Sequence, residues 1–366
     1  MTGAWVAIAA VSFAVVAILV WDRLRRRRDE AQAYLKGVRS VISGDPDAAI
    51  EALSDAARLG SPEAVETYLA LGQLFRRTGD LSRAVRLHRN MLLGPALDPA
   101  RRGEVERELA EDYRRSGMLA EAVEIYRRLA AVDRVAGEGL RDVLADAGDL
   151  AGAVAAQRAL AVPGADPVLA HLLAASAREA LARDPGEAAA LAADALRADG
   201  GSADAHLAAA EVAGVAGDAA AALVQVGLAL DADPLAALLA WPALAAAPDA
   251  TAVASFVEGR LEARRADPAL HLLHGRALHR LGRTADALAA LRRALELDRS
   301  GKVTWEMREL LRHADAPGPG ELAARHDLLV AALLRRGRAP RCTRCGADAP
   351  ARAWRCRRCG AFDAYA

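Results

Sequence analysis

Apolar and polar positions follow each other along most of the chain with the period of an amphipathic α-helix, and the pattern recurs in blocks. Similar blocks stand at residues 71–88, 109–126, 140–157 and 274–291, and they read LGQLFRRTGDLSRAVRLH, LAEDYRRSGMLAEAVEIY, LRDVLADAGDLAGAVAAQ and HGRALHRLGRTADALAAL. In each block an apolar helical stretch is followed by a glycine and then by a second helical stretch. The sequence therefore predicts pairs of helices joined by tight turns.

Each turn glycine is followed five residues later by an alanine. The glycines are Gly44, Gly79, Gly117, Gly148, Gly217 and Gly282, and the alanines are Ala49, Ala84, Ala122, Ala153, Ala222 and Ala287. A glycine allows the left-handed backbone that ends a helix, and the small alanine lets the second helix approach the first closely. Gly72 and Gly275, which lie in the first helix of their pairs, are expected to allow the same close approach.

The spacing of the turns indicates a repeat protein. The first four turns are 35, 38 and 31 residues apart, which resembles the 34-residue period of tetratricopeptide repeats. The gaps from Gly148 to Gly217 and from Gly217 to Gly282 each fit two repeats, with weaker copies at 181–196 and 241–256. Pro234 stands where the last helix of a repeat is expected to end. The alternative, an irregular solenoid or a helical bundle, does not explain why the glycines and alanines keep one register.

We therefore predict an all-α chain in which residues 23–335 form a tetratricopeptide-repeat solenoid of about eight repeats, some of them degenerate. Stacked helix pairs leave a groove that binds proteins or peptides. Gln73, Arg76, Glu111 and Arg114 are candidates to line this partner-binding groove. The alternative for each of them is a solvated side chain with no partner.

Residues 1–22 are predicted to form a membrane anchor. The run 4–21, AWVAIAAVSFAVVAILVW, has no charge over 18 residues, and as a helix it would be roughly 27 Å long, enough to span a bilayer core. The arginine-rich run 23–28 follows it directly, so the rest of the chain is expected in the cytoplasm. The alternatives are a cleaved signal peptide, which would need positive charge before the run and a cleavage site after it, and a buried core helix.

Composition supports an all-α protein without a strong electrostatic field. Apolar residues make up 53% of the chain and aromatic residues only 4%, and the excess is alanine and leucine, which favour helices. The formal net charge is zero, so nucleic acid is not expected as a partner. The sequence has no phosphate-binding, dinucleotide-binding, zinc-protease or nucleophile-elbow motif, and we expect that the chain is not an enzyme.

All four cysteines lie in the last part of the chain, which we predict to be a separate metal-binding domain over 336–366. Cys342 and Cys345 form one CxxC pair, Cys356 and Cys359 form the other, and a glycine follows each pair. Two such loops can direct four thiolates at one metal ion, which we expect to be zinc, with iron as the alternative. Two disulfides are the other interpretation, and they would require an oxidising compartment.

Arginine is unusually frequent near this metal site. From Arg335 onward there are nine arginines and two aspartates. The interpretations are a nucleic-acid-binding ribbon, a solvated or membrane-proximal basic surface, and docking onto acidic faces of the solenoid or of a partner.

Taken together, the anchor, the repeats and the CxxCG-x9-CxxCG tail resemble the family of lipopolysaccharide assembly protein B, also called YciM. The block at 71–88 looks most like the first well-formed repeat of that family, and the tail, with Trp354 two residues before Cys356, is similar to its rubredoxin-like domain. The resemblance implies a single-pass protein of the bacterial inner membrane whose tail packs against its repeats and holds one metal ion with these four cysteines.

The resemblance also implies a function in the control of lipopolysaccharide synthesis. Members of the family act as adaptors that help the membrane protease FtsH to degrade the deacetylase LpxC, and they are linked to lipopolysaccharide export and other envelope proteins. An adaptor of this kind is the leading hypothesis for the chain. The alternative is a membrane-anchored scaffold that organises an envelope-synthesis complex without proteolysis.

Overall fold

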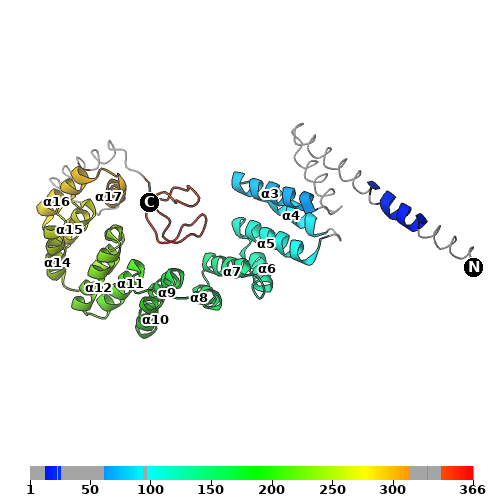
Figure 1. The fold of residues 1–366 in the computed structure, drawn as a ribbon. Helices are drawn as coiled ribbons and strands as arrows, with labels where there is room; N and C mark the ends of the chain where they lie inside the picture. Colours follow the sequence, from blue (N-terminus) through cyan, green and yellow to red (C-terminus); the bar gives the residue numbers. More distant parts are fainter. Residues whose placement is uncertain are drawn as a thin grey trace, which may run out of the picture. The chain divides into compact units, whose positions relative to one another are not determined.

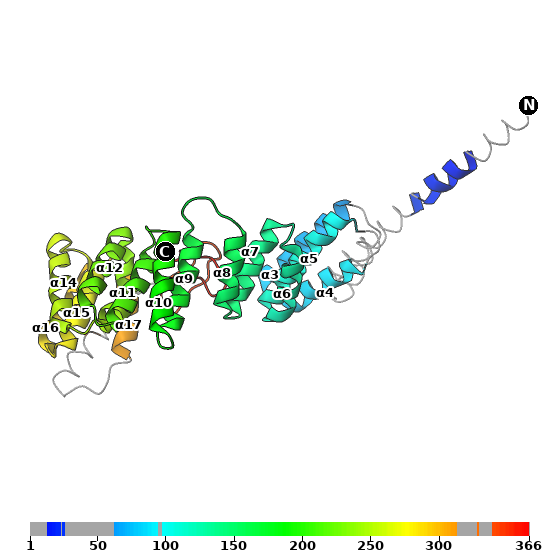
Figure 2. The ribbon, with the colours of Figure 1, turned by 90° about the horizontal axis from the view of Figure 1, so that it is seen from below.

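A computed structural model describes residues 13–22, 24, 25, 62–93, 97–312, 328 and 339–365. The chain divides into two compact units, Met1–Gly148 and Asp149–Ala366. Figures 1 and 2 show that both units are built from short helices that follow one another as antiparallel neighbours. In the first unit these helices are α3 (Pro62–Thr78), α4 (Leu81–Leu92), α5 (Pro99–Arg115), α6 (Leu119–Leu129) and α7 (Arg134–Asp146).

The second unit continues the helical pattern and ends in the cysteine-containing tail. Its helices are α8 (Leu150–Ala159), α9 (Pro167–Ala180), α10 (Pro185–Ala198), α11 (Ala203–Val215), α12 (Ala219–Ala232), the 3-10 helix η1 (Pro234–Leu238), α13 (Trp241–Ala246), α14 (Ala250–Ala263), α15 (Pro268–Arg280), α16 (Thr284–Leu297) and α17 (Lys302–Arg312). Among the described residues there are no strands, only three isolated β-bridges in the tail. The predicted all-α, solenoid-like fold is confirmed.

The turns between paired helices have the predicted chemistry. Gly79, Gly117, Gly148, Gly217 and Gly282 all have φ between 74° and 88°, the left-handed region in which glycine has no steric cost. The alanines five residues later, Ala84, Ala122, Ala153, Ala222 and Ala287, are all at most 3% exposed. Gly44 and Ala49 lie outside the described residues, so that part of the prediction is untested.

Aspartates stand directly before most of the helices that come second in a helix pair, and before many of those that come first. Their side chains accept hydrogen bonds from backbone N–H groups in the first helical turn, which would otherwise have no partner. In three turns the aspartate directly follows the glycine that ends the preceding helix. The capping aspartates are Asp80, Asp98, Asp133, Asp149, Asp166, Asp184, Asp218, Asp249 and Asp267.

The two weak copies also fold as helices but with altered turns. The copy at 181–196 becomes α10, which packs on α9 after a turn without glycine, capped by Asp184. The copy at 241–256 begins with α13, a helix of only six residues. Pro234 starts η1 directly after α12 ends, as predicted, because proline has no N–H to continue the helix. Small buried alanines line much of the core here, so these helices lie close together.

The predicted anchor lies only partly within the described residues. Residues 13–22 are helical, and their large apolar side chains, such as Phe13, Leu19 and Trp21, are exposed. Residues 4–12 are outside the described part. None of the helices that the structure describes has the length and apolar character needed to cross a bilayer. The predicted domain boundaries at 22/23 and 335/336 also involve residues outside the described part and stay predictions.

Candidate metal centre and its docking on the repeats

The two cysteine pairs form two loops with the same backbone hydrogen bonds. In the first loop the Gly346 N–H donates to the Cys342 carbonyl oxygen at 2.8 Å, and the Cys342 N–H donates to Ala347 at 2.9 Å. In the second loop the corresponding bonds join Gly360 to Cys356 and Cys356 to Ala361, both at 2.8 Å. Gly346 and Gly360 have φ of 70° and 72°. Each glycine therefore reverses the chain immediately after its cysteine pair.

This shared geometry brings the four sulfurs together. All four Sγ atoms lie within 4.8 Å of one another. Cys342 Sγ is 3.6 Å from Cys359 Sγ, and Cys345 Sγ is 3.8 Å from Cys356 Sγ. A disulfide requires about 2.05 Å, and all four cysteines are free. A tetrahedral zinc with sulfur ligands at about 2.3 Å separates its sulfurs by about 3.8 Å, so this donor set fits such an ion.

The electrostatics of the sulfurs also favour a cation. Burial opposes ionisation of Cys356, but the backbone N–H of Cys359 and the Tyr365 hydroxyl donate to its sulfur and lower its pKa to about 6. Burial and the neighbouring thiols raise the pKa of Cys359 to about 12. Four thiolates at this spacing repel one another, so a cation is needed to hold all of them in the ionised form. The cluster can hold a metal ion, and it is the sole group of this kind found in the described part of the chain.

The tail docks on the helices of the second unit, next to α9 and α17 (Figures 1 and 2). The Trp305 indole N–H on α17 donates to the Pro350 carbonyl oxygen at 2.6 Å. The Arg352 N–H donates to Glu306 on the same helix at 3.2 Å. Trp354 packs against the apolar core of this unit. The tail is therefore part of the second unit, as the family resemblance implies.

His171 on α9 makes the most extensive of these contacts. Its Nδ1 lies 2.7 Å from Asp204 on α11, and its Nε2 lies 2.7 Å from Asp363 in the tail. The Phe362 ring stacks on the imidazole at 5.3 Å with an interplanar angle of 12°, and the Trp354 ring lies 5.5 Å away. Burial opposes the charge of His171, but Asp204 and Asp363 outweigh it and raise its pKa to about 9.

No sequence motif marks His171 as part of a site. Asp363 is 192 residues away from it along the chain, so no local spacing could have joined the two. The one available indication was an acidic residue soon after the last cysteine pair.

The four predicted groove residues all lie in the first unit, and three of them (Gln73, Arg76 and Arg114) form bonds between the first helices of neighbouring helix pairs. Arg76 on α3 pairs with Glu108 and Asp112 on α5 at 2.5 and 2.6 Å, and Gln73 donates to Glu108 at 3.0 Å. Arg114 on α5 pairs with Asp146 on α7 at 2.6 Å and with Glu111 at 3.1 Å. These contacts brace the repeats. That the same residues hold a partner stays a prediction.

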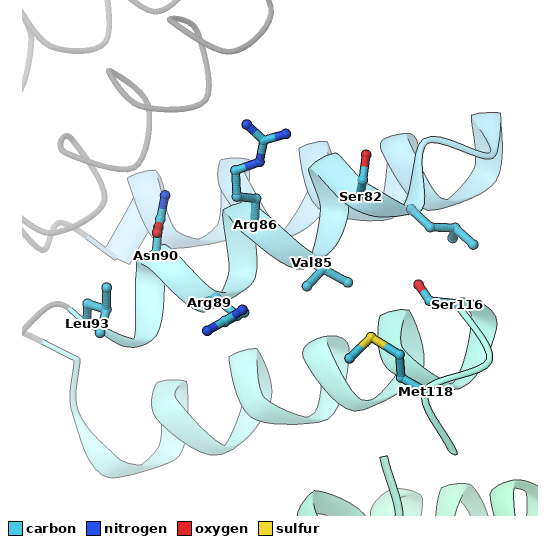
Figure 3. A pocket seen from close by; sticks show the side chains of 9 residues that line it. Ser82, Val85, Arg86, Arg89, Asn90, Leu93, Ser116 and Met118 are labelled. Carbon is cyan, nitrogen blue, oxygen red and sulfur yellow. The ribbon is translucent and has the colours of Figure 1, made fainter. Parts of the chain in front are cut away.

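A hollow of about 730 Å³ lies elsewhere on the first unit, between α4 and the turn from α5 to α6. Figure 3 shows Val85, Arg89, Ser116 and Met118 around this space. None of the four predicted groove residues lines it. The hollow and the cysteine cluster belong to different units of the chain.

Comparison with known proteins identifies the repeats. Residues 67–103 and 268–300 match the model of the tetratricopeptide repeat family. The first match covers most of α3, all of α4 and the start of α5, and the second covers α15 and α16. A solved tetratricopeptide repeat protein from Parabacteroides merdae aligns with 74% of this chain and 98% of its own, at 14% identity and a TM-score of 0.41. A structure of MamA aligns with 71% of this chain and all of its own, at 15% identity and a TM-score of 0.27.

A more specific similarity covers part of the chain. Over 109 residues it is 28% identical to lipopolysaccharide assembly protein B of Escherichia coli strain K12, and the same values hold for the protein of strain O157:H7. The match spans 29% of this chain and 28% of the length of that protein. The chain thus carries tetratricopeptide repeats and is similar to lipopolysaccharide assembly protein B over the matched segment.

Proposed function

We propose that this chain is a non-enzymatic adaptor that regulates lipopolysaccharide synthesis by presenting the deacetylase LpxC to the protease FtsH. Residues 1–22 would anchor it in the bacterial inner membrane, with the bulk of the chain in the cytoplasm. The similarity to lipopolysaccharide assembly protein B supports the pathway. The repeats support a protein-binding role, because stacked helix pairs present extended surfaces for partners.

The observation that carries the proposal is a four-cysteine tail docked on a repeat unit. Repeats alone occur in proteins of many functions. A tail held to them through Trp305, Arg352 and His171 is a more specific arrangement, and it agrees with the arrangement that the family resemblance implies.

The metal site supports a structural role for the tail. Cys342, Cys345, Cys356 and Cys359 would hold one ion, zinc in the first instance and iron as the alternative. With four protein ligands a tetrahedral zinc has no open position for a substrate or water. When bound, the ion would supply the folding free energy that this small domain cannot obtain from a core of its own. This chemistry is consistent with an adaptor.

Purification with crosslinking tests the proposal directly. The tagged full-length chain is crosslinked in cells of its own host, extracted gently from the membranes and purified, and the bound proteins are identified. We expect enrichment of FtsH and LpxC. The matched control is the Cys342→Ser, Cys345→Ser variant, for which we expect less of both proteins.

Two outcomes would count against parts of this proposal. Recovery of envelope-synthesis proteins without FtsH would favour the scaffold. Absence of the chain from the membrane fraction would contradict the anchor.

A further inference from the structure

Two residues of the tail fill a small site formed by α9 and α11. The site consists of His171, which is 4% exposed, Asp204, which is 2% exposed, and Arg178. One Asp204 oxygen accepts a hydrogen bond from His171, and the other forms an ion pair with Arg178, each at 2.7 Å. Arg178 in turn pairs with Glu211 at 2.9 Å. Asp204 therefore fixes the orientation of the His171 ring through Nδ1, and the second ring nitrogen, Nε2, points to the tail.

The tail residues that meet this nitrogen are not required by the metal site. Asp363 and Phe362 follow the last cysteine, and neither is a candidate ligand. Asp363 has φ of 47°, a left-handed conformation that residues other than glycine adopt only occasionally. Its N–H donates to the Trp354 carbonyl oxygen at 2.8 Å. The backbone is thus held in an uncommon conformation that places the Asp363 carboxylate on His171.

We infer that His171, Asp204 and Arg178 form a recognition site for an aromatic residue followed by an acidic one. The chain's own Phe362–Asp363 occupies this site, and a partner segment of the same chemistry competes with it. The inference goes beyond the adaptor proposal and does not depend on it, because the occupant belongs to the chain itself.

The chemistry of the site selects this pair of residues. A protonated imidazole has two N–H donors, and because one is used by Asp204 the other calls for an anionic acceptor. The raised pKa of His171 keeps both protons at neutral pH. The flat face of the charged ring favours an aromatic partner. Arg355 also faces the pair, with its guanidinium 5.6 Å from the Phe362 ring centroid.

The site is also open to a competitor. The Asp363 side chain is 52% exposed, although the histidine that it contacts is buried. A tethered ligand competes at an effective concentration in the millimolar range, so a partner must either bind this site strongly or make further contacts.

The test uses the full-length chain with Phe362→Ala and Asp363→Asn, which vacates the site and keeps all four cysteines. The probe is the capped peptide Ala-Phe-Asp-Ala-Tyr, which has the sequence of residues 361–365, titrated to millimolar concentrations and followed by ligand-observed NMR. We expect the vacated variant to bind it about tenfold more tightly than the unmodified chain. The peptide Ala-Phe-Asn-Ala-Tyr should bind at least about tenfold more weakly, because it loses a charge-assisted hydrogen bond.

Two histidine variants locate the binding. His171→Gln added to the vacated variant should abolish it. His206→Gln is the matched control. Like His171, His206 is a buried histidine, but it lies on α11 and contacts Gln225 and the Gly200 carbonyl oxygen instead of the tail. Three results would overturn the inference. The vacated variant could bind the Asp and Asn peptides equally, it could bind the Asp peptide no more tightly than the unmodified chain does, or it could bind neither peptide. If circular dichroism shows that His171→Gln loses helicity, the inference is tested by comparing the affinities of the vacated variant for the Asp and Asn peptides.

Discussion

At the scale of residues, a glycine in α3 makes room for a buried histidine of α4. A Cβ atom at Gly72 would lie 2.3 Å from His88 Nε2. His88 is fully buried, and its Nδ1 lies 2.5 Å from Asp112 on α5. The histidine cannot move aside without breaking this contact.

We therefore expect Gly72→Ala to destabilise the first unit by about 1–3 kcal/mol, the usual cost of overpacking a core. Gly103→Ala is the control, because that helical glycine has only Leu129 Cδ2 within 4.0 Å. It should be neutral or stabilising by up to about 1 kcal/mol. Hydrogen exchange of α3 and α4 is compared between the two full-length variants. Equal protection of these helices in both variants would contradict the steric explanation.

The sequence was sufficient to predict the turn glycines, the alanines that follow them and the close approach at Gly72. Each of these depends on residues within one helix pair, so local spacing reveals them. The bond from His88 to Asp112 spans 24 residues and two helix pairs. It depends on how successive repeats stack, which the local pattern does not specify.

At the scale of elements, arginines near the end of the first helix of one helix pair bind carboxylates on the first helix of the next pair. Arg76 on α3 reaches α5, Arg114 on α5 reaches α7, and Arg178 on α9 reaches α11. Such pairs fix the register between neighbouring repeats. The sequence suggested Arg76 and Arg114 as surface residues of a groove, because composition cannot distinguish an arginine that contacts a partner from one that contacts the next repeat.

Removal of one such arginine should uncouple two repeats. Arg76→Met would leave the fully buried Asp112 in contact with His88 but without its arginine partner. Loss of one member of a buried pair costs about 3–5 kcal/mol, and because His88 remains, we expect the free energy of unfolding to fall by less than that range. Arg101→Met is the control, because Arg101 pairs with Glu104 at the surface and its loss should have little effect. Urea unfolding followed by circular dichroism compares the two. A similar midpoint for both variants would show that the Arg76 pair does not stabilise the repeats.

At the scale of the whole molecule, the tail connects the candidate metal site to the repeats of the second unit. The sequence was sufficient to predict the cysteine cluster, because the ligand spacing and the following glycines are local features. It could not predict where the tail docks, since His171 on α9 and Trp305 on α17 are far from it along the chain. Docking adds contacts that a metal site alone would not provide.

Docking should depend on pH through His171. Its pKa is raised from 6.5 to about 9 in the folded chain, so its contribution is complete below about pH 6.5 and is lost as the pH rises through about 9. The shift corresponds to no more than about 3–4 kcal/mol. We expect the stability difference between the unmodified chain and His171→Gln to shrink between pH 6.5 and 9.5, as measured by thermal unfolding. A difference that is constant over this range would show that the charge of His171 does not contribute.

Loss of the metal ligands should affect the tail and spare the helices. We expect Cys342→Ser, Cys345→Ser to remove the bound metal while helicity stays nearly unchanged, because the stability of stacked repeats is local. Metal analysis and circular dichroism of the purified chain measure these two quantities. Thr343→Ala, a change inside the same loop, should retain the metal. Equal metal content in the two variants would exclude the four-cysteine site.

The lifetime of LpxC in the host tests the adaptor most directly. Protein synthesis is stopped in cells that carry the unmodified chain, a deletion, or the Cys342→Ser, Cys345→Ser variant, and the decay of LpxC is followed. An adaptor that needs its docked tail predicts that the deletion and the variant lengthen the lifetime to the same extent. An LpxC lifetime that is unchanged by the deletion would contradict the adaptor.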